Sequence, residues 1–189
     1  MVDKSLKLMT DELFSIKKRL DRPVVLVGLM GAGKSTIGRR LANALECSFI
    51  DADDEIEAAA QMTISEIFAQ FGEIHFRDGE RRVLERLINS DYRIIATGGG
   101  AFINEKTRSL ILEKTVAIWI NCDVATLVER TARKDSRPLL KNGNPQEILS
   151  RLYEERAEMY AQAPVHVTSD KGPHEHTVVK ILEALDKWL

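Results

Sequence analysis

Short apolar runs rich in β-branched residues alternate with longer stretches of helical periodicity from Asp21 to the end of the chain. The runs predict five strands, at residues 24–27, 48–51, 93–97, 116–120 and 165–168. Strands that alternate with helices are typical of a parallel sheet with helices on both of its faces. We therefore predict an α/β fold in which one five-stranded parallel sheet lies between two helical layers.

Apolar stripes mark two of the helices. Ile37, Leu41 and Leu45 recur at every fourth position, and their helix is expected to begin where a glycine-rich segment stops. The C-terminal stretch has helical spacing from Val178 to Leu189. It is expected to pack back onto the sheet.

A helical insertion, residues 54–90, follows the second strand. Thr63 and Glu66 form a capping-box sequence inside it, which predicts a helix start. We expect the insertion to supply a wall for a second substrate, with a purely structural helical pair as the alternative. Around residues 133–145 the periodicity lapses, and glycine, proline and charged residues predict an exposed loop that we interpret as a candidate lid.

The N-terminal extension, residues 1–22, contains an amphipathic pattern over residues 4–20 that predicts a short helix. This helix can dock on the body, mediate self-association or lie on a membrane. Docking is favoured because Asp11 and Glu12 interrupt its positive charge. The rest of the chain, residues 23–189, is expected to be one domain, since 189 residues leave no room for a second catalytic domain.

Composition narrows the classes of function. The formal net charge of −2 gives no basic excess for a nucleic-acid or membrane partner, so a small-molecule substrate is expected. No apolar run has the length of a membrane span or a signal peptide, and Cys47 and Cys122 have neither CxxC spacing nor a histidine cluster nearby. We therefore expect a monomeric cytoplasmic protein with reduced thiols.

Four histidines raise the alternative of a metal site, because two of them are separated by a single residue near the C-terminus. They are His75, His166, His174 and His176. No further ligands cluster near them in the sequence, so we interpret them as solvated loop residues.

The clearest motif is GxxxxGK[ST], which Gly28, Gly33, Lys34 and Ser35 match. It follows the first predicted strand and opens a helix, as an ATP phosphate cradle requires. The alternative, a glycine-rich turn without a ligand, does not need the lysine and the hydroxyl. The motif by itself indicates an ATP or GTP phosphate site and says nothing about the acceptor.

The residue type at each position of the cradle has a physical explanation. Glycines let the backbone wrap closely around phosphates, so the amides of Gly31, Ala32 and Gly33 are expected to face ATP. Lys34, expected to be a surface residue, would reach the β- and γ-phosphates. Ser35 would ligate Mg²⁺ and Thr36 would contact the α-phosphate, next to the positive end of the helix.

Residues outside the cradle must define the acceptor. Asp51 and Asp53 end the second strand, and in an extended chain two residues of this spacing point to the same side. We assign Asp51 to the metal and Asp53 to an acceptor hydroxyl, with helix capping by Asp53 as the alternative. Three glycines after the third strand, residues 98–100, offer bare amides to a small ligand. Arg77 could clamp a carboxylate, although a single arginine is more often a surface ion-pair residue.

At this point the chain closely resembles the shikimate kinase family. The segments that carry the resemblance are GLMGAGKST at 28–36, DAD at 51–53, FRDGE at 76–80, GGG at 98–100, RPLL at 137–140 and ERAEMY at 155–160. Their order and spacing match from about residue 23 to 188. The resemblance implies a P-loop fold like that of nucleoside monophosphate kinases, and ATP-dependent phosphorylation of the 3-hydroxyl of shikimate on the way to chorismate and the aromatic amino acids.

The resemblance also implies residue roles. The shikimate-binding residues would be Asp53, Arg77, Gly99 and Arg156, with the two arginines on the carboxylate. Ser35 would bind Mg²⁺ and Asp51 its water shell. Arg137 would reach the transferred phosphate from the lid, and Arg130 would pack on adenine. The adenine loop after the last strand departs from the family pattern, and Lys171 is only a partial match there.

The expected mechanism follows from the loose transition state of phosphoryl transfer, in which positioning and charge neutralisation dominate. Lys34, Mg²⁺ and Arg137 would carry most of the charge stabilisation. Asp53, taken as an aspartate of ordinary pKa, would orient the hydroxyl and accept its proton late. The alternatives are another small-metabolite kinase such as a gluconate kinase, and a nucleotide-binding regulator without catalysis.

Overall fold

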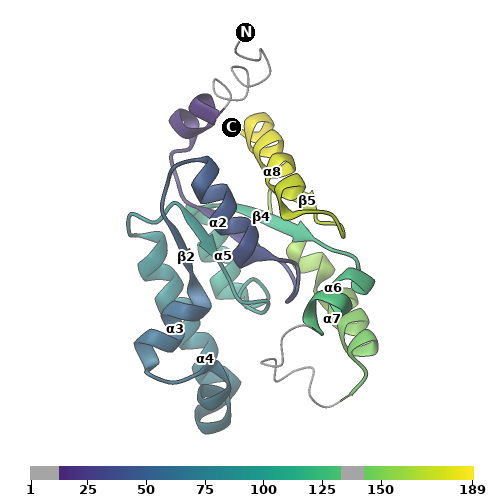
Figure 1. Ribbon diagram of the computed structural model, residues 1–189. Coiled ribbons are helices and arrows are strands. Elements are labelled where there is room, and N and C mark those ends of the chain that lie inside the picture. The colour runs from purple at the N-terminus through teal and green to yellow at the C-terminus, as the bar shows by residue number, and fades with distance from the viewer. Residues whose placement is uncertain (1–12, 133–142) are drawn as a thin grey trace.

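The predicted strands form one sheet in a computed structural model that describes residues 13–132 and 143–189 (Figure 1). The strands are β1 (Val24–Val27), β2 (Phe49–Asp51), β3 (Ile94–Ala96), β4 (Val116–Asn121) and β5 (Val165–Thr168). The helices are α2 (Lys34–Ala44), α3 (Ala52–Ala60), α4 (Ile64–Ile88), α5 (Glu105–Lys114), α6 (Val124–Thr131), α7 (Pro145–Tyr160) and α8 (His174–Trp188). Each strand begins and ends within one residue of its predicted bounds, which confirms the strand prediction.

The strand order is β2-β3-β1-β4-β5, and every pair is parallel. β1 lies at the centre, with Val24 beside Ile94 of β3 and Val116 of β4. All four residues of β1 are fully buried, as expected for a strand covered on both faces, whereas β5 at the edge alternates buried and exposed residues. The carboxyl ends of β1, β2 and β3 therefore meet at one edge of the sheet.

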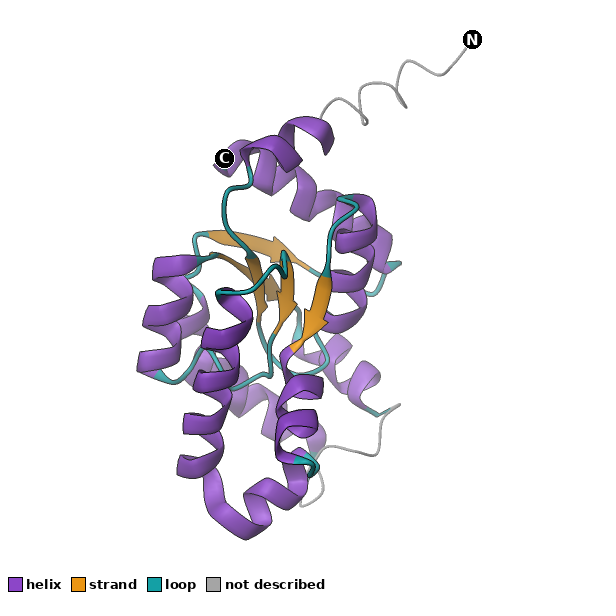
Figure 2. Cartoon of the chain, turned by 90° about the vertical axis from the view of Figure 1, so that its left-hand side faces the viewer, coloured by secondary structure: helices purple, strands orange, loops and turns teal. Residues whose placement is uncertain are grey.

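Helices cover both faces of the sheet (Figure 2). α2 and α8 pack together on one face, and α4 packs with α5 on the other, as right-handed crossovers require. A second, smaller core of Ile56, Ile67 and Phe76 joins α3 to α4 apart from the main core. The helical insertion thus has its own apolar packing.

Local signals explain where the insertion begins and bends. The capping box of Thr63 and Glu66 is present at the start of α4, which confirms that prediction. Gly72, with φ 78° and ψ 175°, breaks the helical geometry inside α4. The insertion is therefore α3 followed by a kinked α4.

Both ends of the described chain pack on the same side of the molecule. Residues 13–19 are helical, Ile16 is buried, and Arg19 forms an ion pair with Asp186 of α8. Residues 1–12, which include most of the predicted helix 4–20, lie outside the described residues. In α8, Val178, Ile181 and Leu185 are buried, as their spacing predicted.

One expectation about loops needs correction, and another lies mostly outside the described residues. The four histidines are in regular structure: His75 in α4, His166 in β5, and His174 and His176 in α8. His75 and His166 lie inside the helical insertion and the strand that the sequence itself predicts, whereas the helix of His174 and His176 begins before the apolar spacing that starts at Val178. Of the candidate lid, residues 133–142 lie outside the described residues, and Pro145 already begins α7.

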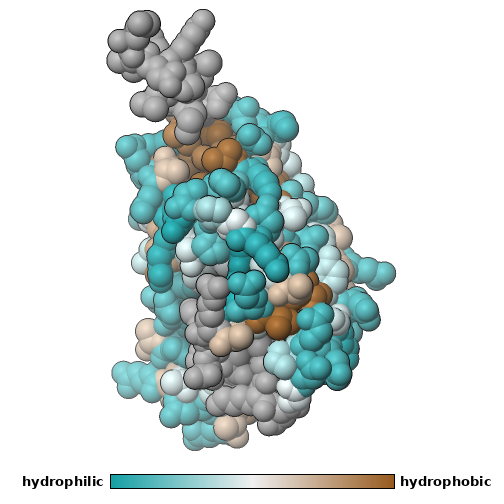
Figure 3. All heavy atoms as spheres, turned by 45° about the vertical axis from the view of Figure 1, so that its right-hand side comes forward, coloured by the Kyte–Doolittle hydropathy of each residue, from teal (hydrophilic) through white to brown (hydrophobic). Residues whose placement is uncertain are grey.

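The face of the molecule in Figure 3 is mostly polar, with hydrophobic residues in small patches. Within residues 13–132 and 143–189, the helices are too short or too polar to cross a bilayer. Both cysteines are free thiols, Cys122 buried and Cys47 half-buried.

Candidate active site

The phosphate cradle connects the carboxyl end of β1 to the start of α2. Gly28 has φ 138° and Gly33 has φ 92°, a backbone region that other residues rarely adopt. A Cβ on Gly28 would lie 2.6 Å from the carbonyl oxygen of Ile120 in β4. The loop can follow this path, close to the central strands, only because glycine stands there.

The N-terminus of α2 opens into the cradle. Its N-cap is Gly33, so no side chain occupies the free N–H groups of the first turn. Ser35 is half-buried and Thr36 is exposed at this helix end. Free amides combined with the helix dipole favour a bound phosphate here.

Lys34 folds back over the loop, and its ammonium donates hydrogen bonds to the carbonyl oxygens of Gly28 at 2.7 Å and Leu29 at 2.9 Å. Only 8% of its surface is exposed. The expectation of a surface residue was therefore wrong. The reason is that the cradle carbonyls offer the ammonium a partner, so the aliphatic stem can be buried.

Arg130 of α6 joins the cradle to the loop between β5 and α8. Its Nη1 donates to the carbonyl oxygen of Ala32 at 3.3 Å and to Ser169 Oγ at 3.1 Å, and its Nη2 donates to the carbonyl of Asp170. The guanidinium thus lies beside the cradle, and its packing on adenine stays a prediction. Lys171, the partial match to the family's adenine loop, is exposed and 3.8 Å from Glu129.

His174, which the sequence reasoning did not assign to the site, also borders the cradle. A Cβ on Gly33 would lie 3.0 Å from His174 Cε1. Burial, followed by the charge of Arg130, lowers the pKa of His174 below its ordinary value. This lowered pKa favours the neutral form of the imidazole.

Asp51, the last residue of β2, and Asp53, in the first turn of α3, differ in their backbone positions. The sequence predicted that Asp51 and Asp53 point to the same side, because the chain was expected to be extended there. α3 already begins at Ala52, so Asp53 is helical and this argument does not apply. Asp51 is the N-cap, because its Oδ1 accepts a hydrogen bond from the backbone N–H of Asp53 at 3.1 Å. The alternative in which Asp53 caps this helix is wrong for the same reason.

Asp53 lies in the first turn of α3 in a partly buried position. Burial, together with the negative charge of Asp51, raises the pKa of Asp53 to about 6, and the nearby Lys34 opposes this rise. The sequence reasoning took Asp53 as an aspartate of ordinary pKa. Its raised pKa makes it a better proton acceptor than that reasoning allowed.

The triple-glycine turn, Gly98–Gly100, brings the remaining site residues together. A Cβ on Gly98 would lie 2.7 Å from Asp53 Oδ1. The carbonyl oxygen of Gly99 accepts a hydrogen bond of 3.2 Å from Arg156 Nη1 of α7. A Cβ on Gly100 would lie 2.3 Å from Arg77 Nη2 of α4. The missing side chains of Gly98 and Gly100 therefore leave room for Asp53 and Arg77, which come from different helices.

Arg77 is held from several sides. Its Nη1 donates to Glu80 Oε2 at 2.7 Å and its Nη2 to Glu73 Oε1 at 3.3 Å. The guanidinium lies 5.0 Å from the ring centroid of Phe76 and 5.9 Å from that of Phe68, within cation–π range. The arginine is thus oriented toward the glycine turn before any ligand binds.

Two further residues were quoted in the sequence motifs without a role. Glu80 is 1% exposed, and burial raises its pKa to about 7 despite the partner Arg77. Tyr160 donates its hydroxyl proton to the carbonyl of Gly99, and burial raises the pKa of Tyr160 to about 12. Their motif positions, FRDGE and ERAEMY, were the available signal. Glu80 holds the guanidinium of Arg77, and Tyr160 shares the carbonyl oxygen of Gly99 with Arg156.

The protein donors near the cradle fit Mg²⁺. Ser35 offers a hydroxyl and Asp51 a carboxylate, and Mg²⁺ in kinases is held by one or two protein oxygens together with phosphates and water. In the part of the chain that the structure describes, no cluster of three or more His, Cys, Asp or Glu residues exists for a metal held by protein alone.

Comparisons with known proteins agree with this geometry. The family model described as shikimate kinase matches residues 30–186. A shikimate kinase from Novosphingobium aromaticivorans is 57% identical over 186 residues, covering 96% of each chain. The solved shikimate kinase from Acinetobacter baumannii in complex with shikimate is 34% identical with a TM-score of 0.84, covering 90% of this chain and 95% of that one.

A solved gluconokinase from Sinorhizobium meliloti is similar at a TM-score of 0.59 and 17% identity, covering 90% of this chain and 94% of that one. This second likeness concerns the fold alone. The expected three-layer P-loop fold, similar to nucleoside monophosphate kinases, is confirmed by the sheet topology and the solved shikimate kinases. The matched span and the high identity to curated relatives show that the chain belongs to the shikimate kinase family.

Proposed function

We propose that the residues assembled at this sheet edge carry out the reaction of the family, the ATP-dependent phosphorylation of the 3-hydroxyl of shikimate to shikimate 3-phosphate. This reaction is a step toward chorismate and the aromatic amino acids. The observation that supports it most is the triple-glycine turn, which gathers Asp53, Arg77 and Arg156 beside the phosphate cradle.

At the acceptor end, Arg77 and Arg156 bind the carboxylate of shikimate and Gly99 supplies backbone contact. Two guanidiniums on one carboxylate give specificity, because an acceptor without the acid leaves both poorly paired. Asp53, on the other side of Gly98, orients the hydroxyl that is phosphorylated. Its raised pKa allows it to accept the hydroxyl proton as the new bond to phosphorus forms.

At the nucleotide end, the amides of Gly31, Ala32 and Gly33 hold the phosphates. Lys34 exchanges its carbonyl partners for phosphate oxygens when ATP binds. Thr36 contacts the α-phosphate, and Arg130 packs on the adenine.

Ser35 would hold Mg²⁺ directly, and Asp51 would hold it through the water shell of the ion. The bound ion would neutralise charge on the phosphates. The proposed contribution of Arg137 falls outside the described residues and stays a prediction: Arg137→Ala should mainly lower kcat. A normal kcat in that variant would contradict its placement on the transferred phosphate.

The deciding experiment measures ATP consumption with shikimate, with gluconate and without an acceptor. We expect turnover with shikimate only. Turnover with gluconate would favour the gluconate kinase alternative, and ATP binding without turnover on any acceptor would favour the regulator.

We also propose that the protein works as a cytoplasmic monomer on small molecules and does not bind nucleic acid. The near-neutral charge of −2 and the absence of a spanning helix in the described residues support this proposal. Sedimentation at micromolar concentration tests the oligomeric state.

A further inference from the structure

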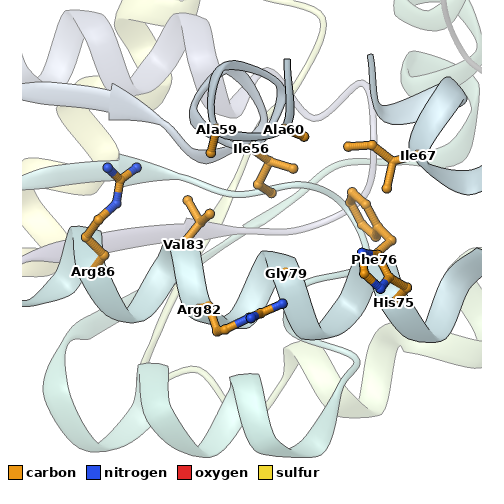
Figure 4. Close-up of a pocket in the computed structure, with 10 residues that line it drawn as sticks. All are labelled: Ile56, Ala59, Ala60, Ile67, His75, Phe76, Gly79, Arg82, Val83 and Arg86. Atoms are coloured by element: carbon orange, nitrogen blue, oxygen red, sulfur yellow. The ribbon is translucent and has the colours of Figure 1, made fainter. Parts of the chain in front are cut away.

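A groove of about 490 Å³ lies between α3 and α4 (Figure 4). Its apolar wall includes Ile56 of α3 with Phe76 and Val83 of α4. In α4 the groove residues His75, Gly79, Arg82 and Arg86 recur at helical spacing and so share one face, whereas Arg77 and Glu80 lie on the opposite face. The groove is therefore separate from the site that faces the glycine turn.

Gly79 keeps the floor of the groove open. It is an interior residue of α4, where glycine costs about 0.5–1 kcal/mol relative to alanine. A Cβ on Gly79 would meet no atom within 4 Å, so no backbone or packing constraint in the described structure demands a glycine. The missing side chain has one visible effect, which is to leave space between the two helices.

The ionised side chains that line the groove are two arginines, Arg82 and Arg86. Arg86 lies at one end and His75 at the other, with Arg82 beside Gly79 (Figure 4). None of the described residues that line the groove is acidic. Arg82 pairs with Asp78 at 3.2 Å and Arg86 with Glu55 at 2.7 Å, but each bond uses a single guanidinium nitrogen out of three. Both arginines therefore keep donors for an anion.

We propose that this groove binds a small aromatic carboxylate. The volume of the groove lies in the range of small-molecule sites, and a flat ring can pack against its apolar wall. The carboxylate would accept hydrogen bonds from Arg82 and from one of the end residues, His75 or Arg86. A ligand without the carboxylate would leave the remaining guanidinium donors of Arg82 and Arg86 without an acceptor.

Occupancy of the groove should weaken the binding of shikimate. Phe76 lines the groove, and its ring also lies 5.0 Å below the guanidinium of Arg77. Ile56 follows Asp53 by one turn of α3 on the same side. A ring wedged between the helices would therefore displace Arg77 and Asp53 relative to each other. This coupling rests on the proposed acceptor roles of these two residues, whereas the binding itself does not.

The test uses the full chain and 2-naphthoate as probe, measured by calorimetry in the presence of MgADP. We expect saturable one-to-one binding, with 2-naphthalenemethanol binding at least threefold more weakly. Gly79→Leu, which fills the groove, should weaken binding at least tenfold, and Arg82→Gln at least threefold. Arg151→Gln is the matched control, because Arg151 is an exposed helical arginine of α7 with an i,i+4 acidic partner, and it should bind normally.

Coupling is read from kinetics. The probe should raise the KM for shikimate at least threefold in the unmodified protein and leave it unchanged in Gly79→Leu, whose activity without probe should be normal. By reciprocity, saturating shikimate should weaken probe binding by the same factor. If Gly79→Leu does not fold, Arg82→Gln carries the same comparison.

Three results would overturn the inference. Absence of binding would remove the site, and binding that survives Gly79→Leu but is lost in Arg156→Ala would place the probe in the acceptor site. Binding that Gly79→Leu abolishes, with an unchanged KM for shikimate, would remove the coupling. The assay without probe measures the proposed kinase reaction by itself. A failure of that reaction is therefore distinguishable from a failure of probe binding or of coupling.

Discussion

Arg156 donates a hydrogen bond of 3.2 Å to the carbonyl oxygen of Gly99, 57 residues earlier in the chain. Tyr160, one turn further along α7, donates to the same oxygen. The carbonyl thus fixes the end of α7 to the glycine turn, with Arg77 on the neighbouring Gly100. Two arginines from helices far apart in sequence therefore lie beside consecutive glycines of one turn.

Arg156→Ala should mainly raise the KM for shikimate. Loss of a hydrogen bond to a charged group costs about 1.5–3 kcal/mol, which corresponds to about 10- to 100-fold in kcat/KM. Initial rates at varied shikimate and saturating MgATP measure it, with Arg151→Gln as the control. A change confined to the KM for ATP would show that Arg156 does not bind the acceptor.

Gly100→Ala should reproduce part of the loss of Arg77 without damaging the fold. The added Cβ would lie 2.3–2.7 Å from atoms of the Arg77 guanidinium, which can move because it is the end of a flexible side chain. We expect a KM for shikimate raised about tenfold, equivalent to about 1.4 kcal/mol, at a nearly unchanged melting temperature. Gly79→Ala, whose Cβ meets nothing within 4 Å, is the matched control and should keep a normal KM.

Asp53→Asn should lower kcat by about 10²- to 10⁴-fold, since the amide cannot accept the hydroxyl proton. In the unmodified enzyme, kcat/KM should fall as the pH drops below about 6, because the pKa of Asp53 is raised to about 6 and protonation removes the acceptor. Rates over pH 5–8 test this. A profile that stays flat through pH 6 would show that another group accepts the proton.

The same substitution should stabilise the fold at pH 8. The folded pKa of Asp53, about 6, exceeds the ordinary 3.8, so folding favours the protonated form. The contribution of Asp53 to stability is fully present below pH 3.8 and is lost as the pH rises through about 6. Asn carries no such loss, so Asp53→Asn should gain about 1–3 kcal/mol over the unmodified protein at pH 8 and little below pH 4. Urea unfolding at both values checks it, and an equal difference at both would contradict it.

Lys34→Met should abolish turnover, with kcat lowered at least about 10³-fold, because the ammonium is expected to neutralise charge on the transferred phosphate. The fold should persist with a loss of about 1–2 kcal/mol, since the carbonyls of Gly28 and Leu29 lose a donor. A phosphate-release assay and thermal melting measure the two effects. Activity retained in a folded variant would remove Lys34 from the mechanism.

Arg130→Ala should raise the KM for ATP more than that for shikimate, by about tenfold. The substitution removes the hydrogen bonds to Ala32 and Ser169 that tie the cradle to the loop before α8. Equal rises in both KM values would instead indicate a general loosening of the sheet edge.

The sequence by itself determined the strands, the cradle and the start of α4, because each depends on local rules. VVLV at 24–27 is apolar throughout because a central parallel strand is covered on both faces. The capping box at Thr63 needs only four consecutive residues. The motif from Gly28 to Ser35 specifies its loop through glycine conformation.

Only the tertiary structure decided how these parts meet and how they are charged. Periodicity does not encode that β1 lies between β3 and β4, nor that Arg77 and Arg156 reach one turn, since both depend on packing between distant segments. The pKa of Asp53 and the buried ammonium of Lys34 arise from desolvation, which exists only once the chain is folded. The sequence therefore determined which chemical groups are available, and folding decided their distances and their protonation.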